Sequence, residues 1–119
     1  MLARLGDVQA ARQSYRKAIS LREQLLATQP TNNNFRMDLA KTSWDIAEME
    51  SKLGANASAA ISERRRYWRE ARSWYERCYQ GWIEVRDRGA LIPANAGVPE
   101  LVASAIAGCD KALAKLIEK

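Results

Sequence analysis

The sequence predicts an all-α protein built as an antiparallel stack of about four helices. Apolar residues recur every three or four positions along most of the chain, which is the spacing of one helix face. Clusters of turn residues interrupt this spacing, and no segment alternates apolar and polar residues as a strand would. With 119 residues, 47% of them hydrophobic and 28% charged, the chain has the size and composition of one globular domain, which we place at 1–119.

The first half of the chain contains two expected helices, at 7–29 and 33–53. Pro30 ends the first of them, and the polar turn 31–34 supplies side chains that can cap the second. Gly54 stands where a helix commonly ends on a left-handed residue, and we expect it to do so here. The first apolar stripe is Val8, Ala11, Tyr15, Ala18, Leu21 and Leu25, and the second is Phe35, Leu39, Ser43, Ile46, Met49 and Leu53.

The second half contains a long helix at 58–88 and a final helix at 98–118. Gly89 marks the end of the long helix, and Pro99 suits the first turn of the last one. The long helix is apolar on more than one side, so it must be covered by several neighbours or bind a partner. Its main apolar positions are Ile61, Trp68, Tyr75 and Trp82 with Ala71, Cys78 and Val85, and those of the last helix are Val102, Ile106, Cys109, Leu113 and Leu116.

Several short motifs in this pattern resemble tetratricopeptide repeats, which are antiparallel helix pairs stacked side by side. The spacing of a repeat's second helix is found twice, in Leu5-Gly6-Asp7, Ala11, Tyr15, Ala18 and Ile19 and again in Ala71, Tyr75, Cys78 and Tyr79. Residues like those of a repeat's first helix lie between them, in Pro30-Thr31-Asn32, Leu39-Ala40 and Ile46-Ala47. The long segment before Pro30 is similar to the longer repeats of kinesin light chains, and the closing part of the chain resembles the C-terminal repeats of bacterial serine/threonine protein kinases.

The resemblance implies both a division of the chain and a function. It implies that 7–29 is the second helix of a partial repeat, that 33–53 and 58–88 form a pair with an extended second helix, and that 98–118 caps the stack. It also implies a non-enzymatic protein-protein interaction scaffold within a larger bacterial signalling protein. Because the first helix would lack its own partner, a homodimer through this uncapped end, or a structural dimerisation segment, is an alternative.

The binding groove of such repeats is lined mainly by the first helix of each pair. Carried over to the helix at 33–53, the resemblance implies partner-binding positions at Lys41, Trp44, Glu48, Ser51 and Lys52. Trp44 lies off the apolar stripe of its helix, so it is either an aromatic anchor for a protein or peptide partner or a side chain packed against the neighbouring helix. Lys41 and Lys52 would suit the carboxylate of a peptide.

A run of arginines begins the long helix, at Arg64, Arg65, Arg66, Arg69 and Arg72. One interpretation is a solvated face on which some of the arginines pair with Glu63, Glu70 and Glu76. Arg72 with Glu76, and further along the helix Glu84 with Arg88, have the i,i+4 spacing of ion pairs. A second is an acidic protein or peptide partner. A third is a basic helical nucleic-acid-binding domain, in which arginines contact phosphates while the neighbouring aromatic residues stack on bases. The net charge of +5 is modest for that function, so nucleic acid is the least favoured partner.

The residue inventory argues against catalysis. The chain has no histidine, and its two cysteines, Cys78 and Cys109, lie on apolar stripes, where core residues are the favoured interpretation and a disulfide is the alternative. The glycines are isolated rather than grouped in a phosphate-binding loop, and we expect no catalytic site, metal or cofactor. No segment approaches the ~20 apolar residues of a membrane span, and the N-terminus lacks the apolar core of a signal peptide, so we expect a cytoplasmic protein.

Overall fold

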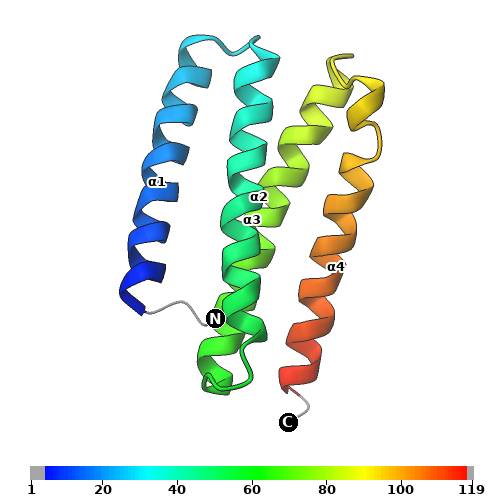
Figure 1. The fold of residues 1–119 in the computed structure, drawn as a ribbon. Coiled ribbons are helices and arrows are strands. Elements are labelled where there is room, and N and C mark those ends of the chain that lie inside the picture. The colour runs from blue at the N-terminus through cyan, green and yellow to red at the C-terminus, as the bar shows by residue number, and fades with distance from the viewer. Residues whose placement is uncertain (1–4, 118–119) are drawn as a thin grey trace.

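The computed structural model describes residues 5–117 and confirms the all-helical fold, with no strand in that part of the chain (Figure 1). The helices are α1 (Leu5–Thr28), α2 (Asn33–Ala55), α3 (Ile61–Asp87) and α4 (Val98–Ile117), with a short 3₁₀ helix, η1 (Pro93–Asn95), before α4. The observed ends lie within three residues of the expected ones. The expected end at 118 falls outside the described residues.

Successive helices run antiparallel and pack side by side, so that α2 and α4 run in the same direction on either side of α3 (Figure 1). The pairing of α2 with α3 is the most extensive, that of α3 with α4 is next, and α1 packs mainly on α2. As a result α3 is a central helix that makes extensive contacts with both α2 and α4. Helix α1 lies at the edge of the stack and makes its main contact with α2 alone.

The hydrophobic core lies between α2, α3 and α4 and combines small with aromatic residues. Small side chains bring the helices close together, because a Cβ placed on Gly81 of α3 would lie only 3.1 Å from the Ala40 Cβ of α2. Larger side chains such as Trp82, which is 3% exposed, fill the remaining space. The core cluster consists of Ala40, Ala47, Ala71, Tyr75, Cys78, Trp82, Val102 and Cys109.

Three helix ends expected from the sequence can be compared with the structure. Asn32 caps α2, because its side-chain oxygen accepts a hydrogen bond from the Phe35 N–H at 3.1 Å, and Gly89 follows α3 with a left-handed φ of 73°. The expected left-handed end at Gly54 is wrong, since Gly54 stays inside α2 without a positive φ. Gly54 instead makes room for Trp68 of α3, whose ring atoms would lie 2.8 Å from a Cβ at this position.

The apolar stripe expected for the first helix is partly wrong. Val8 and Ile19 are buried against α2, but Leu21 and Leu25 are 60% and 48% exposed. The physical reason is that α1 packs mainly on one neighbour, so that only a narrow side of the helix is covered. The outer side of α1 therefore presents apolar side chains to solvent.

An arginine and a carboxylate join each successive pair of helices. The three links are Arg12 Nη2 to Glu50 Oε1 at 2.6 Å, Arg36 Nε to Glu84 Oε2 at 2.7 Å, and Arg72 Nε to Asp110 Oδ1 at 2.6 Å. Arg72 also pairs with Glu76, as its i,i+4 spacing predicts. The pair expected between Glu84 and Arg88 is absent from the ion pairs of residues 5–117, because Glu84 turns to Arg36 of the neighbouring helix.

Candidate functional site

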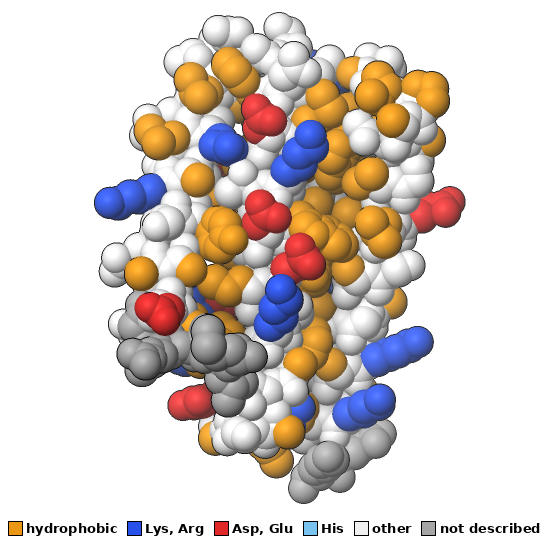
Figure 2. Space-filling view, viewed as in Figure 1, with side chains coloured by type: hydrophobic (Ala, Val, Ile, Leu, Met, Phe, Trp, Pro, Cys, Tyr) orange, Lys and Arg blue, Asp and Glu red, His pale blue; other side chains and the backbone are white. Residues whose placement is uncertain are grey.

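A groove runs between α2 and α4, with α3 as its floor. Its upper part in the view of Figure 1 is a hollow of about 430 Å³, which we call the upper hollow. Figure 2 shows hydrophobic side chains gathered on this face between α2 and α4. The upper hollow is lined by Lys41, Trp44 and Asp45 of α2, Cys78 and Trp82 of α3, Asn95 of η1, and Val98, Leu101 and Val102 of α4.

Trp44 forms the α2 wall of the upper hollow and is half-buried. Its ring meets the Tyr75 ring edge-on, with the centroids 4.9 Å apart and the planes at 63°. Packing against a neighbouring helix, one of the two interpretations of Trp44, is therefore observed. The same side chain still borders the groove, and across it Leu101 of α4 is 58% exposed.

The other α2 positions implied by the resemblance are spread along the groove side of the helix. Lys41 is exposed and lines the upper hollow. The Ser51 hydroxyl donates to the Glu48 carbonyl oxygen at 2.8 Å, so this hydroxyl is already used within its own helix. Lys52 is exposed and does not line the upper hollow. Partial burial raises the pKa of Asp45, and the negative charge of Glu48 raises it further. Two acidic side chains therefore lie close to each other on this wall.

A second hollow, of about 580 Å³, lies between α3 and α4 beside the end of α2, and we call it the lower hollow. Three positively charged side chains line it, namely Arg64 from the first turn of α3 and Lys111 and Lys115 from the last turns of α4. The remaining lining residues are Ala55, Trp68, Gly108, Ala112 and Leu116. Sequence reasoning missed the two lysines, although their i,i+4 spacing does predict that they share one side of their helix.

The arginine run does not form one continuous face, because successive residues of a helix point about 100° apart. Arg64 enters the lower hollow, and its Nε donates to the Gly54 carbonyl oxygen at 2.8 Å. Arg66 lies 5.7 Å from the centre of the Tyr67 ring, and Arg72 pairs with Glu76 of its own helix and with Asp110 of α4. Arg65 is half-buried and Arg69 is exposed. The structure thus brings only Arg64 of the five into the groove.

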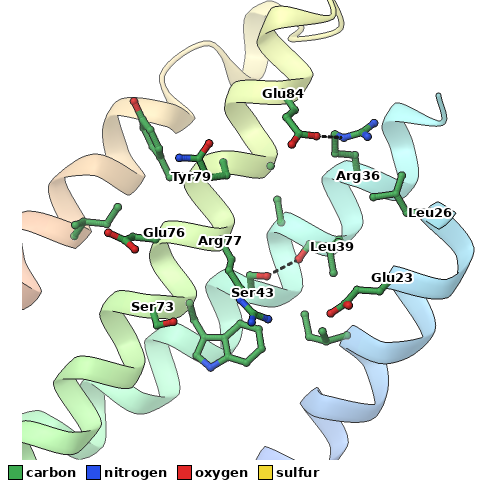
Figure 3. Close-up of a pocket in the computed structure, with 16 residues that line it drawn as sticks. Glu23, Leu26, Arg36, Leu39, Ser43, Ser73, Glu76, Arg77, Tyr79 and Glu84 are labelled. Carbon is green, nitrogen blue, oxygen red and sulfur yellow. Dashed lines mark hydrogen bonds and ion pairs between the residues drawn. The ribbon is translucent and has the colours of Figure 1, made fainter. Parts of the chain in front are cut away.

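A hollow of about 890 Å³ lies on the other face of the stack, between α1, α2 and α3 (Figure 3). Glu23 and Leu26 face it from α1, and Arg36 and Glu84 meet across it in an ion pair. Arg77 lies 4.6 Å from the centre of the Trp74 ring. Arg36 and Arg77, two arginines that line this hollow, therefore already interact with other side chains of the protein. The hollow is wide because α1 packs mainly on α2.

Both cysteines are buried in the core cluster. Burial raises the pKa of the Cys78 thiol to about 12 and that of the Cys109 thiol to about 11, and both cysteines are free. Such thiols are protonated near neutral pH and behave as small core residues. Within residues 5–117 no cluster of three or more potential metal ligands occurs. None of the helices described in this range is both long and apolar enough to span a bilayer.

No protein-family model, curated protein or solved structure matches this chain. The resemblance to tetratricopeptide repeats therefore stays a prediction that rests on the motifs quoted above. The all-helical stack and its groove are observed independently of that resemblance, and they carry the functional argument that follows.

Proposed function

We propose that this chain is a non-enzymatic protein-binding scaffold that takes a peptide segment of another protein in the groove between α2 and α4. The single observation that carries the proposal is the upper hollow. Trp44, Trp82 and Leu101 surround a space of about 430 Å³, which is large enough for a bulky apolar side chain. Aromatic residues at the edge of such a space are typical of the anchors that dominate protein interfaces.

The surroundings of this hollow also favour binding over packing alone. Leu101 is more than half exposed, so its apolar surface is in water until a partner covers it. Lys41 and Asp45 lie at the rim, where polar side chains can contact a peptide backbone without being buried. The walls belong to α2 and α4, both of which pack on α3, so the site is held open by a rigid framework.

Peptide display tests the proposal directly. Peptides of random sequence are selected on the whole chain, and their affinities are measured by fluorescence polarisation for the wild type and for Leu101→Glu. Because this change places a charge in the apolar hollow without removing a buried side chain, we expect binding to weaken about tenfold or more with little change in stability.

Leu21→Glu is the matched control, since Leu21 is equally exposed and lies on α1, away from the groove. It should bind the selected peptides like the wild type. Peptides that bind Leu101→Glu as tightly as the wild type would contradict the proposal, because the upper hollow would then play no part in recognition.

Self-association is a second candidate function, and the outer side of α1 favours it. Leu21 and Leu25 are exposed one turn apart on a helix that packs mainly on α2, and a second copy could cover them. Sedimentation velocity at micromolar concentrations should then show dimers for the wild type and monomers for Leu25→Glu. A wild type that stays monomeric would remove this candidate.

We place this scaffold within a larger bacterial signalling protein of the cytoplasm, on the basis of the sequence resemblance alone. The buried, protonated thiols are compatible with the reducing conditions of that compartment. Nucleic acid remains the less favoured partner, since most of the arginine run lies outside the groove.

A further inference from the structure

Among the described residues, those that line the lower hollow carry an excess of positive charge. Arg64, Lys111 and Lys115 line it, and no carboxylate is among its lining residues in the described part of the chain. The interhelical arginines behave differently, because Arg12 and Arg36 each face a carboxylate within 3 Å. None of the ion pairs found within residues 5–117 includes a member of the basic trio.

Arg64 is held in place beside the lower hollow. It lies in the first turn of α3, and its Nε donates to the Gly54 carbonyl oxygen at 2.8 Å, which fixes the position of the guanidinium. A carboxylate entering the hollow would therefore meet one preorganised cation and two lysines.

The charge of the lining differs between the two hollows. Lys41 and Asp45 both line the upper hollow, with Glu48 one turn further along α2, whereas every charged residue that lines the lower hollow is basic. Figure 2 shows both acidic and basic side chains over α2 and basic side chains toward the lower end of α4. An acidic side chain of a peptide would therefore be attracted to the lower hollow more than to the upper one, which favours one direction of the peptide in the groove.

The separation of the two hollows sets a spacing for the ligand. Leu101 in the upper hollow precedes Lys111 and Lys115 by 10 and 14 residues on α4. At about 1.5 Å per helical residue the hollows are roughly 15–21 Å apart along the groove. An extended chain covers roughly 3.3 Å per residue, so this span corresponds to about five or six residues of an extended peptide.

We propose that the groove binds an extended acidic peptide whose apolar side chain fills the upper hollow while an acidic side chain, about five or six residues away, contacts Arg64, Lys111 and Lys115. This inference rests on the proposed function and adds the charge of the ligand and the spacing of its two contacts. The carboxylate is a side chain of the peptide, so the ligand can be an internal segment of its protein.

The test uses the peptides selected on the wild-type chain, with both termini blocked so that only side chains carry charge. Those that depend on Leu101 should contain an acidic residue at the expected distance from an apolar one. For such a peptide, Lys111→Glu should weaken binding about five- to tenfold, because attraction becomes repulsion. A peptide whose acidic residue is replaced by Lys should bind Lys111→Glu more tightly than it binds the wild type, because the lining of the hollow is then less positive.

Lys17→Glu is the matched control, because it makes the same change in net charge at an exposed position of α1. It should leave the affinity unchanged. Leu101-dependent peptides that lack acidic residues, or that bind Lys111→Glu like the wild type, would overturn the inference and leave the proposed function intact. Peptides that ignore Leu101 would instead overturn the proposed function.

A short single-stranded oligonucleotide serves as the competing probe. The inference predicts that it does not displace the selected peptide at physiological salt. Displacement from the wild type, together with direct binding of the oligonucleotide that is lost in Lys111→Glu but kept in Leu101→Glu, would mean that the basic trio binds a phosphate backbone. This result would overturn the assignment to an acidic peptide.

Discussion

The attachment of α1 and the packing among α2, α3 and α4 differ in kind. α2, α3 and α4 share a core in which aromatic, aliphatic and small side chains interlock, whereas α1 rests mainly on α2. The α1 contact contains a few buried apolar residues, among them Val8 and Ile19, and an ion pair between Arg12 and Glu50, which is only 2% exposed. A three-helix body with a shared apolar core thus carries an edge helix that has a smaller contact with it.

This difference indicates that the proposed binding function belongs to the three-helix body. Both hollows of the proposed binding groove are lined by α2, α3 and α4 and not by α1. Loosening α1 should therefore leave the groove intact, while damage to the core should remove both stability and binding. The predictions below test this separation.

The largest effect is expected for Trp82→Ala. Trp82 is 3% exposed and connects the core cluster to the floor of the upper hollow, so its removal leaves a large cavity. We expect a loss of about 3–5 kcal/mol in the free energy of unfolding, measured by urea titration. A loss below about 1 kcal/mol would show that the body is not packed as described.

Glu50→Ala should have a smaller and more local effect. It leaves the Arg12 guanidinium without its partner in a partly buried position, and we expect a loss of about 1–3 kcal/mol. Hydrogen exchange should show faster exchange in α1, while the amides of α3 keep their protection because their packing is untouched. Equal loss of protection in all four helices would contradict the distinction between body and edge.

Two glycines give a matched pair within the body. A Cβ on Gly54 would lie 2.8 Å from the Trp68 ring, so Gly54→Ala should destabilise the protein by about 1–2 kcal/mol even though alanine favours helices. Gly108 of α4 has no atom within 4 Å of such a Cβ, so Gly108→Ala should stabilise it by about 0.5–1 kcal/mol. Thermal unfolding of the two variants should move in opposite directions, and a shared direction would refute the close Gly54–Trp68 contact.

The smallest effect concerns pH and again involves the α1 contact. Burial raises the pKa of Glu50 above its ordinary value near 4.5, although the Arg12 hydrogen bond acts in the opposite direction. The folded state then binds this proton more tightly than the unfolded state, so stability falls as pH rises from about 4.5 through the folded pKa. Across this window the wild type should lose stability relative to Glu50→Gln, and an unfolding free-energy difference that stays constant would contradict the raised pKa.

The helical fold could be predicted from the sequence because each helix carries its own pattern. The apolar spacing located all four helices, and Asn32 and Gly89 mark helix ends where their chemistry predicts. The errors share one physical cause, because the pattern of a helix does not say which neighbour it meets. Gly54 serves the Trp68 ring rather than a left-handed turn, and Leu21 lies on a side that no other helix covers.

The candidate site was predictable only in part for the same reason. The resemblance implied Lys41 and Trp44, and both line the upper hollow. The other implied positions do not line it, and the Ser51 hydroxyl donates to a carbonyl oxygen of its own helix. The basic trio combines Arg64 with two lysines from the far end of the chain, and only tertiary packing brings them together.

The arginine–carboxylate links between successive helices affect how far each helix can slide along the axis of its neighbour. Helices that meet through small, similar side chains can slide past each other by one turn, about 5.4 Å, and still find acceptable apolar contacts. Such a slip would separate Arg36 from Glu84 and Arg72 from Asp110, leaving charges without partners. The links therefore add a preference for one alignment of α2, α3 and α4 to that of the apolar core, and this alignment keeps the two hollows at a constant distance from each other.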